Sequence, residues 1–202
     1  MAWSTTEYRS IPQSPSLGVQ SALQATGGML VPGSLAPIFT LPDADMCMFD
    51  LADAISRHNV VLYFYPRNGM PSCTRQAIQY SDNESAFADC DAVMVGVSLD
   101  SCQRHAAYRD AHGLAMQLLS DEEAEVCRLY GVFEQLDVGG VPRASVQRAS
   151  FIIGRDGVIH DVFHDAGAQD HLAAVLQSLK ELTRSKHGDR QKYRRHAGLQ
   201  SP

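Results

Sequence analysis

The sequence predicts an α/β sandwich in which helices flank a central mixed β-sheet. Two apolar runs, VVLYFY at residues 60–65 and AVMVGVS at 92–98, have the continuous β-branched and aromatic composition of buried parallel strands. Near the C-terminal end, two more strand-like segments flank an Asp-Gly pair, which is typical of a β-hairpin. Strands that alternate with helices and finish in a hairpin indicate a sheet with both parallel and antiparallel pairs.

The predicted elements follow from local signals along the chain. In order, they are strand 60–65, helix 73–89, strand 92–98, helices 101–112 and 121–130, strands 149–153 and 158–163, and helix 168–184. We expect Ser72 to be the N-cap of the first helix, because its hydroxyl can accept a backbone hydrogen bond. Helix 121–130 opens with four acidic residues among five, which suits the positive end of a helix dipole. The last helix is amphipathic, with leucines and a valine on one face.

The composition fits one domain with additional segments at its ends. The chain has 202 residues, of which 45% are hydrophobic and 20% are charged. It lacks the run of roughly eighteen apolar residues that a membrane span requires, and it shows no secretory signal pattern. Its five cysteines are scattered, which fits neither a disulfide scaffold nor a zinc site. We therefore expect a cytoplasmic protein with one or two reactive thiols and no contact with membranes.

Charge divides the chain into three parts. We expect a partly flexible N-terminal extension at residues 1–33, a domain at 34–183 and a basic C-terminal tail at 184–202. Residues 37–179 hold 9 Lys or Arg against 20 Asp or Glu, whereas residues 180–202 hold 7 against 2. An acidic body argues against general nucleic-acid binding, which needs a basic face. The tail is expected to be a solvated terminus, with contact to an anion or a partner as the alternative.

Cys73 lies where a buried strand, a proline-bounded loop and a helix start meet. Unpaired N–H groups and the positive end of the helix dipole favour a thiolate over a thiol at this position. The thiolate is the nucleophilic form of cysteine. An arginine from a neighbouring strand would stabilise it further, and Arg148 stands directly before strand 149–153. The alternative is that Cys73 is a buried structural cysteine.

Residues 60–74, VVLYFYPRNGMPSCT, resemble the active-site segment of peroxiredoxins. The similarity is to the bacterioferritin-comigratory-protein branch, PrxQ, which usually reads VVLYFYPKDDTPGCT. Further blocks keep the order and spacing of that branch. They are VGVSLDS at 95–101 followed by His105, LLSD at 118–121, YGV at 130–132, and RASFII at 148–153 followed by Asp156-Gly157. The resemblance covers roughly residues 33–182.

The resemblance implies a thioredoxin-like fold and a thiol-based peroxidase. Cys73 would be the peroxidatic cysteine, which attacks the terminal oxygen of a hydroperoxide and becomes a sulfenic acid. Arg148 would hold the thiolate and polarise the peroxide, and Pro66 and Pro71 would shape and shield the pocket. Backbone N–H groups at the helix start would donate to the peroxide oxygens. No metal, haem or flavin is needed, and the sequence holds no glycine-rich phosphate loop.

Two positions of the substrate pocket depart from this pattern. The family carries Thr, or sometimes Ser, at the position of Met70, and its hydroxyl bonds the peroxide. A thioether is a weak acceptor and no donor, and removal of one catalytic donor costs on the order of 10²–10³ in rate in well-studied enzymes. Ser72 replaces the usual Gly. Its hydroxyl would either cap the helix, which we favour, or partly substitute for the lost donor.

The resolving cysteine of the family has no direct counterpart. Many members place it five residues after the peroxidatic cysteine, where this chain has Ile78, and others place it at the position of Arg109. Cys102 is the best remaining candidate, with a packed or exposed thiol as its alternative. The resemblance then favours a one-cysteine cycle with an external reductant, such as thioredoxin or glutaredoxin/glutathione. We expect a monomer or a homodimer.

Three functions follow from these observations. The first is a PrxQ-like peroxidase of hydrogen peroxide or organic hydroperoxides. The second is a diverged peroxiredoxin-fold enzyme that uses Cys73 on a non-peroxide electrophile in a specialised pathway. The third is a redox sensor or interaction protein that uses its extension and tail. The presence of Cys73 and Arg148 favours the first two, and Met70 favours the second over the first.

Overall fold

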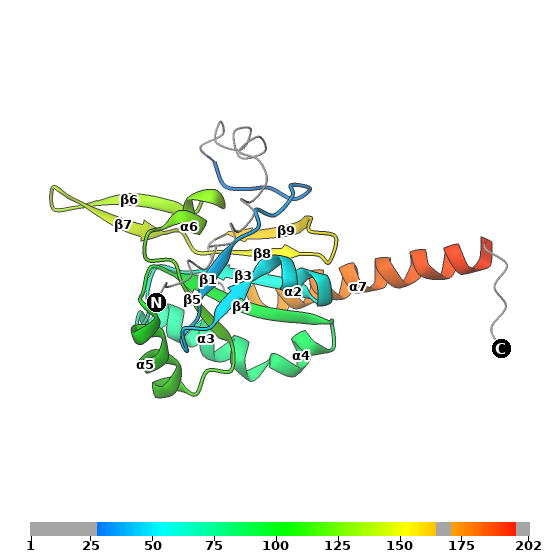
Figure 1. The fold of residues 1–202 in the computed structure, drawn as a ribbon, viewed down its shortest axis with the longest axis horizontal. Coiled ribbons are helices and arrows are strands. Elements are labelled where there is room, and N and C mark those ends of the chain that lie inside the picture. Colours follow the sequence, from blue (N-terminus) through cyan, green and yellow to red (C-terminus); the bar gives the residue numbers. More distant parts are fainter. Residues whose placement is uncertain (1–27, 165–170, 197–202) are drawn as a thin grey trace, which may run out of the picture.

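The computed structural model describes residues 28–164 and 171–196 and has a five-stranded sheet at its centre (Figure 1). Across the sheet the strands are β5 (Gln117–Ser120), β4 (Ala92–Ser98), β3 (Asn59–Phe64), β8 (Ala149–Ile153) and β9 (Ile159–His164). β3 pairs in parallel with β4, and β4 with β5, whereas β8 is antiparallel to both β3 and β9. The predicted mixed sheet is therefore confirmed, with the hairpin at one edge.

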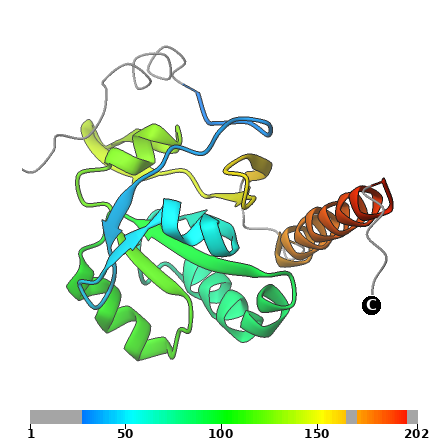
Figure 2. The ribbon, with the colours of Figure 1, turned by 45° about the vertical axis from the view of Figure 1, so that its right-hand side comes forward.

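Helices cover both faces of the sheet. They are α2 (Leu51–Arg57), α3 (Pro71–Asp82), α4 (Glu84–Ala88), α5 (Cys102–His112), α6 (Glu125–Leu129) and α7 (His171–His196). Side chains of α2 and α6 pack on one face with Leu62 and Phe64 of β3. Side chains of α3, α4, α5 and α7 pack on the other with Val61 and Tyr63. Figure 2 shows the ribbon of these helices from a second side. Because both faces are covered, β3 is a continuous run of apolar and aromatic residues from Val60 to Phe64, without polar alternation.

The helix α2, the strand β5 and two small hairpins add to the predicted elements. β1 (Thr40–Pro42) pairs with β2 (Met48–Asp50), and β6 (Phe133–Val138) pairs with β7 (Val141–Val146). The second hairpin projects from the body (Figure 1). Its turn is formed by Gly139 and Gly140 at φ values of 66° and 84°, a region that glycine enters without steric cost.

Two predicted helices have different boundaries in the structure. The predicted helix 73–89 is divided at Asn83 into α3 and α4, and α3 begins at Pro71 with Met70 as its N-cap. The expectation that Ser72 caps this helix is therefore wrong, because proline is preorganised for the first helical position and starts the helix earlier. The predicted helix 121–130 is reduced to α6, because Ala124 adopts the left-handed conformation just before it.

The ends of the predicted domain also extend further than expected. The N–H of Leu30 donates to the Tyr130 carbonyl at 3.3 Å, so part of the expected extension packs on the body. Residues 1–27 of that extension, and 168–170 of the predicted last helix, lie outside the described residues. α7 continues to His196, so the first part of the basic tail is helical and projects from the body (Figures 1 and 2). Within the described ranges, no helix is long and apolar enough to cross a membrane.

Candidate active site

Cys73 is buried in the first turn of α3, near the carboxyl end of β3. It is the third residue of the helix, and 1% of its surface is exposed. The N–H of Thr74 donates to the Met70 carbonyl, which closes the first helical turn. The first N–H groups of a helix have no hydrogen-bond partner within it. Pro71 has no N–H, so at the start of α3 these unpaired groups belong to Ser72 and Cys73. The thiol therefore lies beside two backbone donors and the positive end of the helix dipole.

Arg148 contacts the sulfur directly. Its Nη2 lies 2.9 Å from Cys73 Sγ and 2.9 Å from the hydroxyl oxygen of Ser72. The antiparallel pairing of β3 with β8 explains this contact, because Arg148 stands at the start of β8, next to the end of β3. A guanidinium at this distance stabilises a thiolate. The Nε of Arg148 is buried without a hydrogen-bond partner among the described residues, so one donor of the same group is unused.

The loop between β3 and α3 is tied to the junction of β4 and α5. The N–H of Asn68 donates to Asp100 Oδ2 at 2.6 Å, and the Tyr65 hydroxyl donates to Asn68 Oδ1 at 2.9 Å. The side-chain amide of Asn68 also lies 3.2 Å from Nδ1 of His105, which is fully buried. Burial lowers the pKa of His105, so its imidazole is neutral near pH 7. These contacts fix the loop that precedes Cys73.

The other predicted pocket residues belong to this loop and the helix start. Pro66 follows β3 directly and Pro71 is the first residue of α3, so two prolines bound the loop. Met70 is half-buried and packs against the apolar cluster that contains Cys73. Ser72 does not cap the helix, and its hydroxyl accepts the hydrogen bond from Arg148 instead. Sequence alone did not indicate this contact, because the two residues are 76 positions apart.

The candidate resolving residue Cys102 is the first residue of α5 and is half-buried. It follows Asp100 by two positions, so it lies near the tethered loop rather than at the sulfur itself. All five cysteines are free thiols. Burial raises the pKa of Cys90 and of Cys127, which favours the unreactive thiol at both positions. Cys73 is thus set apart from the other buried cysteines by its guanidinium partner.

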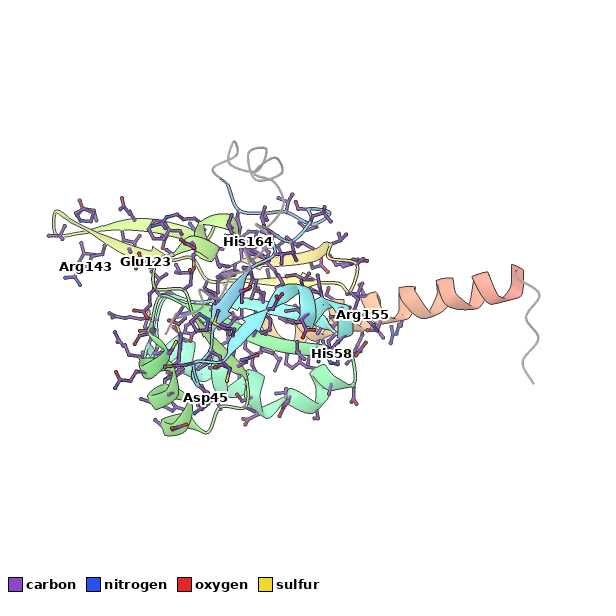
Figure 3. All side chains as sticks on the ribbon, viewed as in Figure 1. Asp45, His58, Glu123, Arg143, Arg155 and His164 are labelled. Atoms are coloured by element: carbon purple, nitrogen blue, oxygen red, sulfur yellow. The ribbon has the colours of Figure 1, made fainter. Side chains whose placement is uncertain are left out.

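No metal centre is found in the described part of the chain. Within it, no group of three or more His, Cys, Asp or Glu side chains is placed to hold an ion. Asp45, His58, Glu123 and His164 come from different parts of the chain and are spread over the molecule (Figure 3).

The model of the AhpC/TSA family matches residues 32–162 of this chain. The chain belongs to the AhpC/TSA family. Peroxiredoxin Bcp of Escherichia coli K12 is 35% identical over 149 residues, which are 74% of this chain and 95% of that protein. Peroxiredoxin Bcp of Bacillus subtilis 168 is 33% identical over 124 residues, 61% of this chain and 79% of that protein.

Solved structures agree with this assignment. The crystal structure of Peroxidoxin BcpB from Mycobacterium tuberculosis superposes with a TM-score of 0.68 at 29% identity, covering 75% of this chain and 97% of the other. Peroxiredoxin Q from Xanthomonas campestris gives a TM-score of 0.68 at 25% identity, covering 78% and 99%. The predicted membership of the Bcp/PrxQ branch and the thioredoxin-like fold are therefore confirmed. This AhpC/TSA member is a thiol-dependent peroxidase, which acts on peroxides and is reduced by thiols.

Proposed function

We propose that Cys73 is the peroxidatic cysteine and that this peroxiredoxin reduces hydrogen peroxide or organic hydroperoxides. The observation that carries the proposal is the 2.9 Å contact between Arg148 Nη2 and Cys73 Sγ at the start of α3. A cation contacts the sulfur at a helix start, where backbone N–H groups lack partners inside the helix, and such surroundings favour the nucleophilic thiolate. Cys90 and Cys127 are also buried. Among the described residues, however, no arginine forms a hydrogen bond to either of their sulfur atoms, as Arg148 does to Cys73.

The reaction begins with attack of the Cys73 thiolate on the terminal oxygen of ROOH. The O–O bond breaks and an S–O bond forms, and because the terminal oxygen carries its own hydrogen, Cys73 becomes a sulfenic acid directly. The leaving RO⁻ takes a proton from water and departs as ROH. Negative charge moves from sulfur to the leaving oxygen, and the unused Nε donor of Arg148 and the N–H groups of the helix start stabilise it there.

Ser72 and Met70 form the polar and apolar sides of the substrate pocket, which Pro66 and Pro71 bound. A hydroxyl can accept two hydrogen bonds and donate one. Ser72 accepts from Arg148, and its own O–H is left to donate to a peroxide oxygen. Met70 supplies an apolar wall and no donor. Ser72 thereby takes over part of the role that a hydroxyl at position 70 would have.

Reduction proceeds through an external thiol in a one-cysteine cycle. The thiol attacks the sulfenic sulfur, water leaves, and a second thiol releases Cys73 from the mixed disulfide. Thioredoxin or glutaredoxin/glutathione would supply these thiols to a cytoplasmic monomer or homodimer. Support comes from Cys102, which is a free thiol and begins a different helix from the one that carries Cys73. Cys102 stays the candidate for an intramolecular alternative.

The test is the second-order rate of Cys73 oxidation by hydrogen peroxide and by an organic hydroperoxide, followed by stopped flow. We expect a rate far above that of a free thiol, a sulfenic acid on Cys73 by trapping and mass spectrometry, and loss of both in Cys73→Ser. Cys102→Ser is the matched control, and it should oxidise and turn over as the unaltered protein does. A rate near that of a free thiol would contradict the proposal.

Met70 favours a second candidate function, attack of Cys73 on a non-peroxide electrophile. Its half-buried thioether at the N-cap of α3 makes this side of the pocket apolar. Met70→Thr restores a hydroxyl at that position, and if the pocket has diverged from peroxide chemistry the oxidation rate should rise at least several-fold. An unchanged or lower rate would show that Met70 does not limit the peroxide reaction.

A further inference from the structure

His171, the first residue of α7, is a buried polar residue that the peroxide chemistry described above does not use. It is 7% exposed, and its ring packs edge-on against Tyr80 of α3 and Phe163 of β9. Its Nε2 lies 3.0 Å from the hydroxyl oxygen of Ser150, which is fully buried in β8. A buried imidazole with a hydrogen-bonded partner holds one orientation, so it can position the elements that meet around it.

The contact continues through buried side chains to the helix that carries Cys73. The Tyr80 hydroxyl lies 3.5 Å from Ser150 Oγ and accepts from the Gln76 amide at 3.2 Å. Gln76 in turn accepts from the Tyr63 hydroxyl of β3 at 2.8 Å. We name Tyr63, Gln76, Tyr80, Ser150 and His171 the buried polar row. It joins α3, β3, β8 and α7 directly behind the active site.

Ser150 also lies two positions after Arg148, so both side chains point to the same face of the sheet. Ile152, two further on, packs in the same cluster as Cys73. In the described ranges, no acidic side chain forms an ion pair with Arg148. Besides its hydrogen bonds to Ser72 and Cys73, the direction of its guanidinium depends on how the start of β8 is held, and the contact between Ser150 and His171 helps to hold it.

We propose that His171 is a positioning residue, which acts through Ser150 to aim the guanidinium of Arg148 at the sulfur of Cys73. This inference rests on the proposed function of Cys73. The imidazole suits the position because it is neutral. Burial, with a smaller contribution from the charge of Arg148, lowers the pKa of His171 to about 4. A positively charged side chain at this position would repel the guanidinium instead of supporting it.

The experiment compares His171→Ala with Ser178→Ala. Ser178 is a matched control, because it is a buried residue of the same helix whose hydroxyl donates to Asp161 of β9, away from Arg148. Both variants loosen α7, but only the first disturbs the buried polar row. We expect His171→Ala to lower the rate of Cys73 oxidation at least tenfold and to lower the rate of its alkylation by iodoacetamide as well. Ser178→Ala should change both by less than twofold.

Two further variants separate positioning from a general loss of packing. His171→Gln keeps a side-chain amide within reach of Ser150 and should recover most of the rate. If His171→Ala does not fold, Ser150→Ala takes its place with the same expected loss, because it removes the other partner of the same hydrogen bond. In an Arg148→Ala background, His171→Ala should cause no further loss, because its target is absent. The inference would be overturned if His171→Ala and Ser178→Ala lowered the oxidation rate equally. It would also be overturned if His171→Ala lowered the rate further in the Arg148→Ala background. A slow rate in the unaltered protein would instead count against the function proposed for Cys73.

Discussion

Replacement of Arg148 by methionine tests the centre of the proposed mechanism. The change keeps an apolar stem of similar length and removes the charged donor that lies 2.9 Å from Cys73 Sγ. A hydrogen bond to a charged group contributes about 1.5–3 kcal/mol. With about 1.4 kcal/mol for each factor of ten, the oxidation rate of Cys73 should fall by about 10- to 150-fold. Arg148→Lys should recover part of this loss, since it keeps the charge but not the planar fork.

The assay is stopped-flow oxidation by hydrogen peroxide, with the alkylation rate of Cys73 measured in parallel. Arg143→Met is the matched control, because Arg143 is an exposed residue of the β6–β7 hairpin (Figure 3). It should leave both rates unchanged. If Arg148→Met oxidises within threefold of the unaltered protein, the guanidinium does not activate the sulfur and the reasoning from this contact is refuted.

Three predictions concern stability. The carboxylate of Asp121 accepts hydrogen bonds from two N–H groups of α6, at 3.3 and 2.8 Å. Asp121→Ala removes it and should lower the free energy of unfolding by about 1–3 kcal/mol and Tm by several degrees. Asp137→Ala, in an exposed turn, is the control and should change neither quantity. Because the pKa of His171 is about 4 in the folded protein, the unfolded chain binds an extra proton below pH ~6.5. The free energy of unfolding should therefore fall by up to about 3 kcal/mol from that pH down to pH ~4 in urea titrations, and less in His171→Gln. Gly131 has a φ of +70°, and a Cβ added to it would collide with the backbone of Gly28. Gly131→Ala should therefore destabilise the protein and speed proteolysis near Gly28. Unchanged proteolysis would contradict this prediction.

The central strands were predictable because they are buried on both faces. β4 and β8 match their predicted ranges, and β3 is shifted by one residue. The short strand β5, the short helix α2 and the two small hairpins were not predicted, because short elements give little pattern; β5 has four residues and α2 has seven. β1 and β2 have three residues each, too few for a pattern, and most of β6 and β7 is exposed, so no alternation of apolar and polar residues marks them.

The site shows the same division between local and tertiary information. A strand, a proline and a helix start are local signals, and they placed Cys73 correctly in the first turn of α3. The contact of Arg148 with Ser72 depends on strand pairing, so it could not be read from the neighbourhood of either residue. Gln76 and His171 were missed because a polar residue on a helix is usually exposed, and only packing against the sheet buries these two.

The 1% exposure of Cys73 has a consequence for the reductive half of the cycle. A peroxide consists of few atoms and needs little room, whereas a protein thiol can form a mixed disulfide only when its own Cβ comes within about 4 Å of the Cβ of Cys73. The first turn of α3 therefore has to open before a protein reductant can reach the sulfur. The free energy of that local opening would then set the turnover number, and hydrogen exchange of this single turn would measure it.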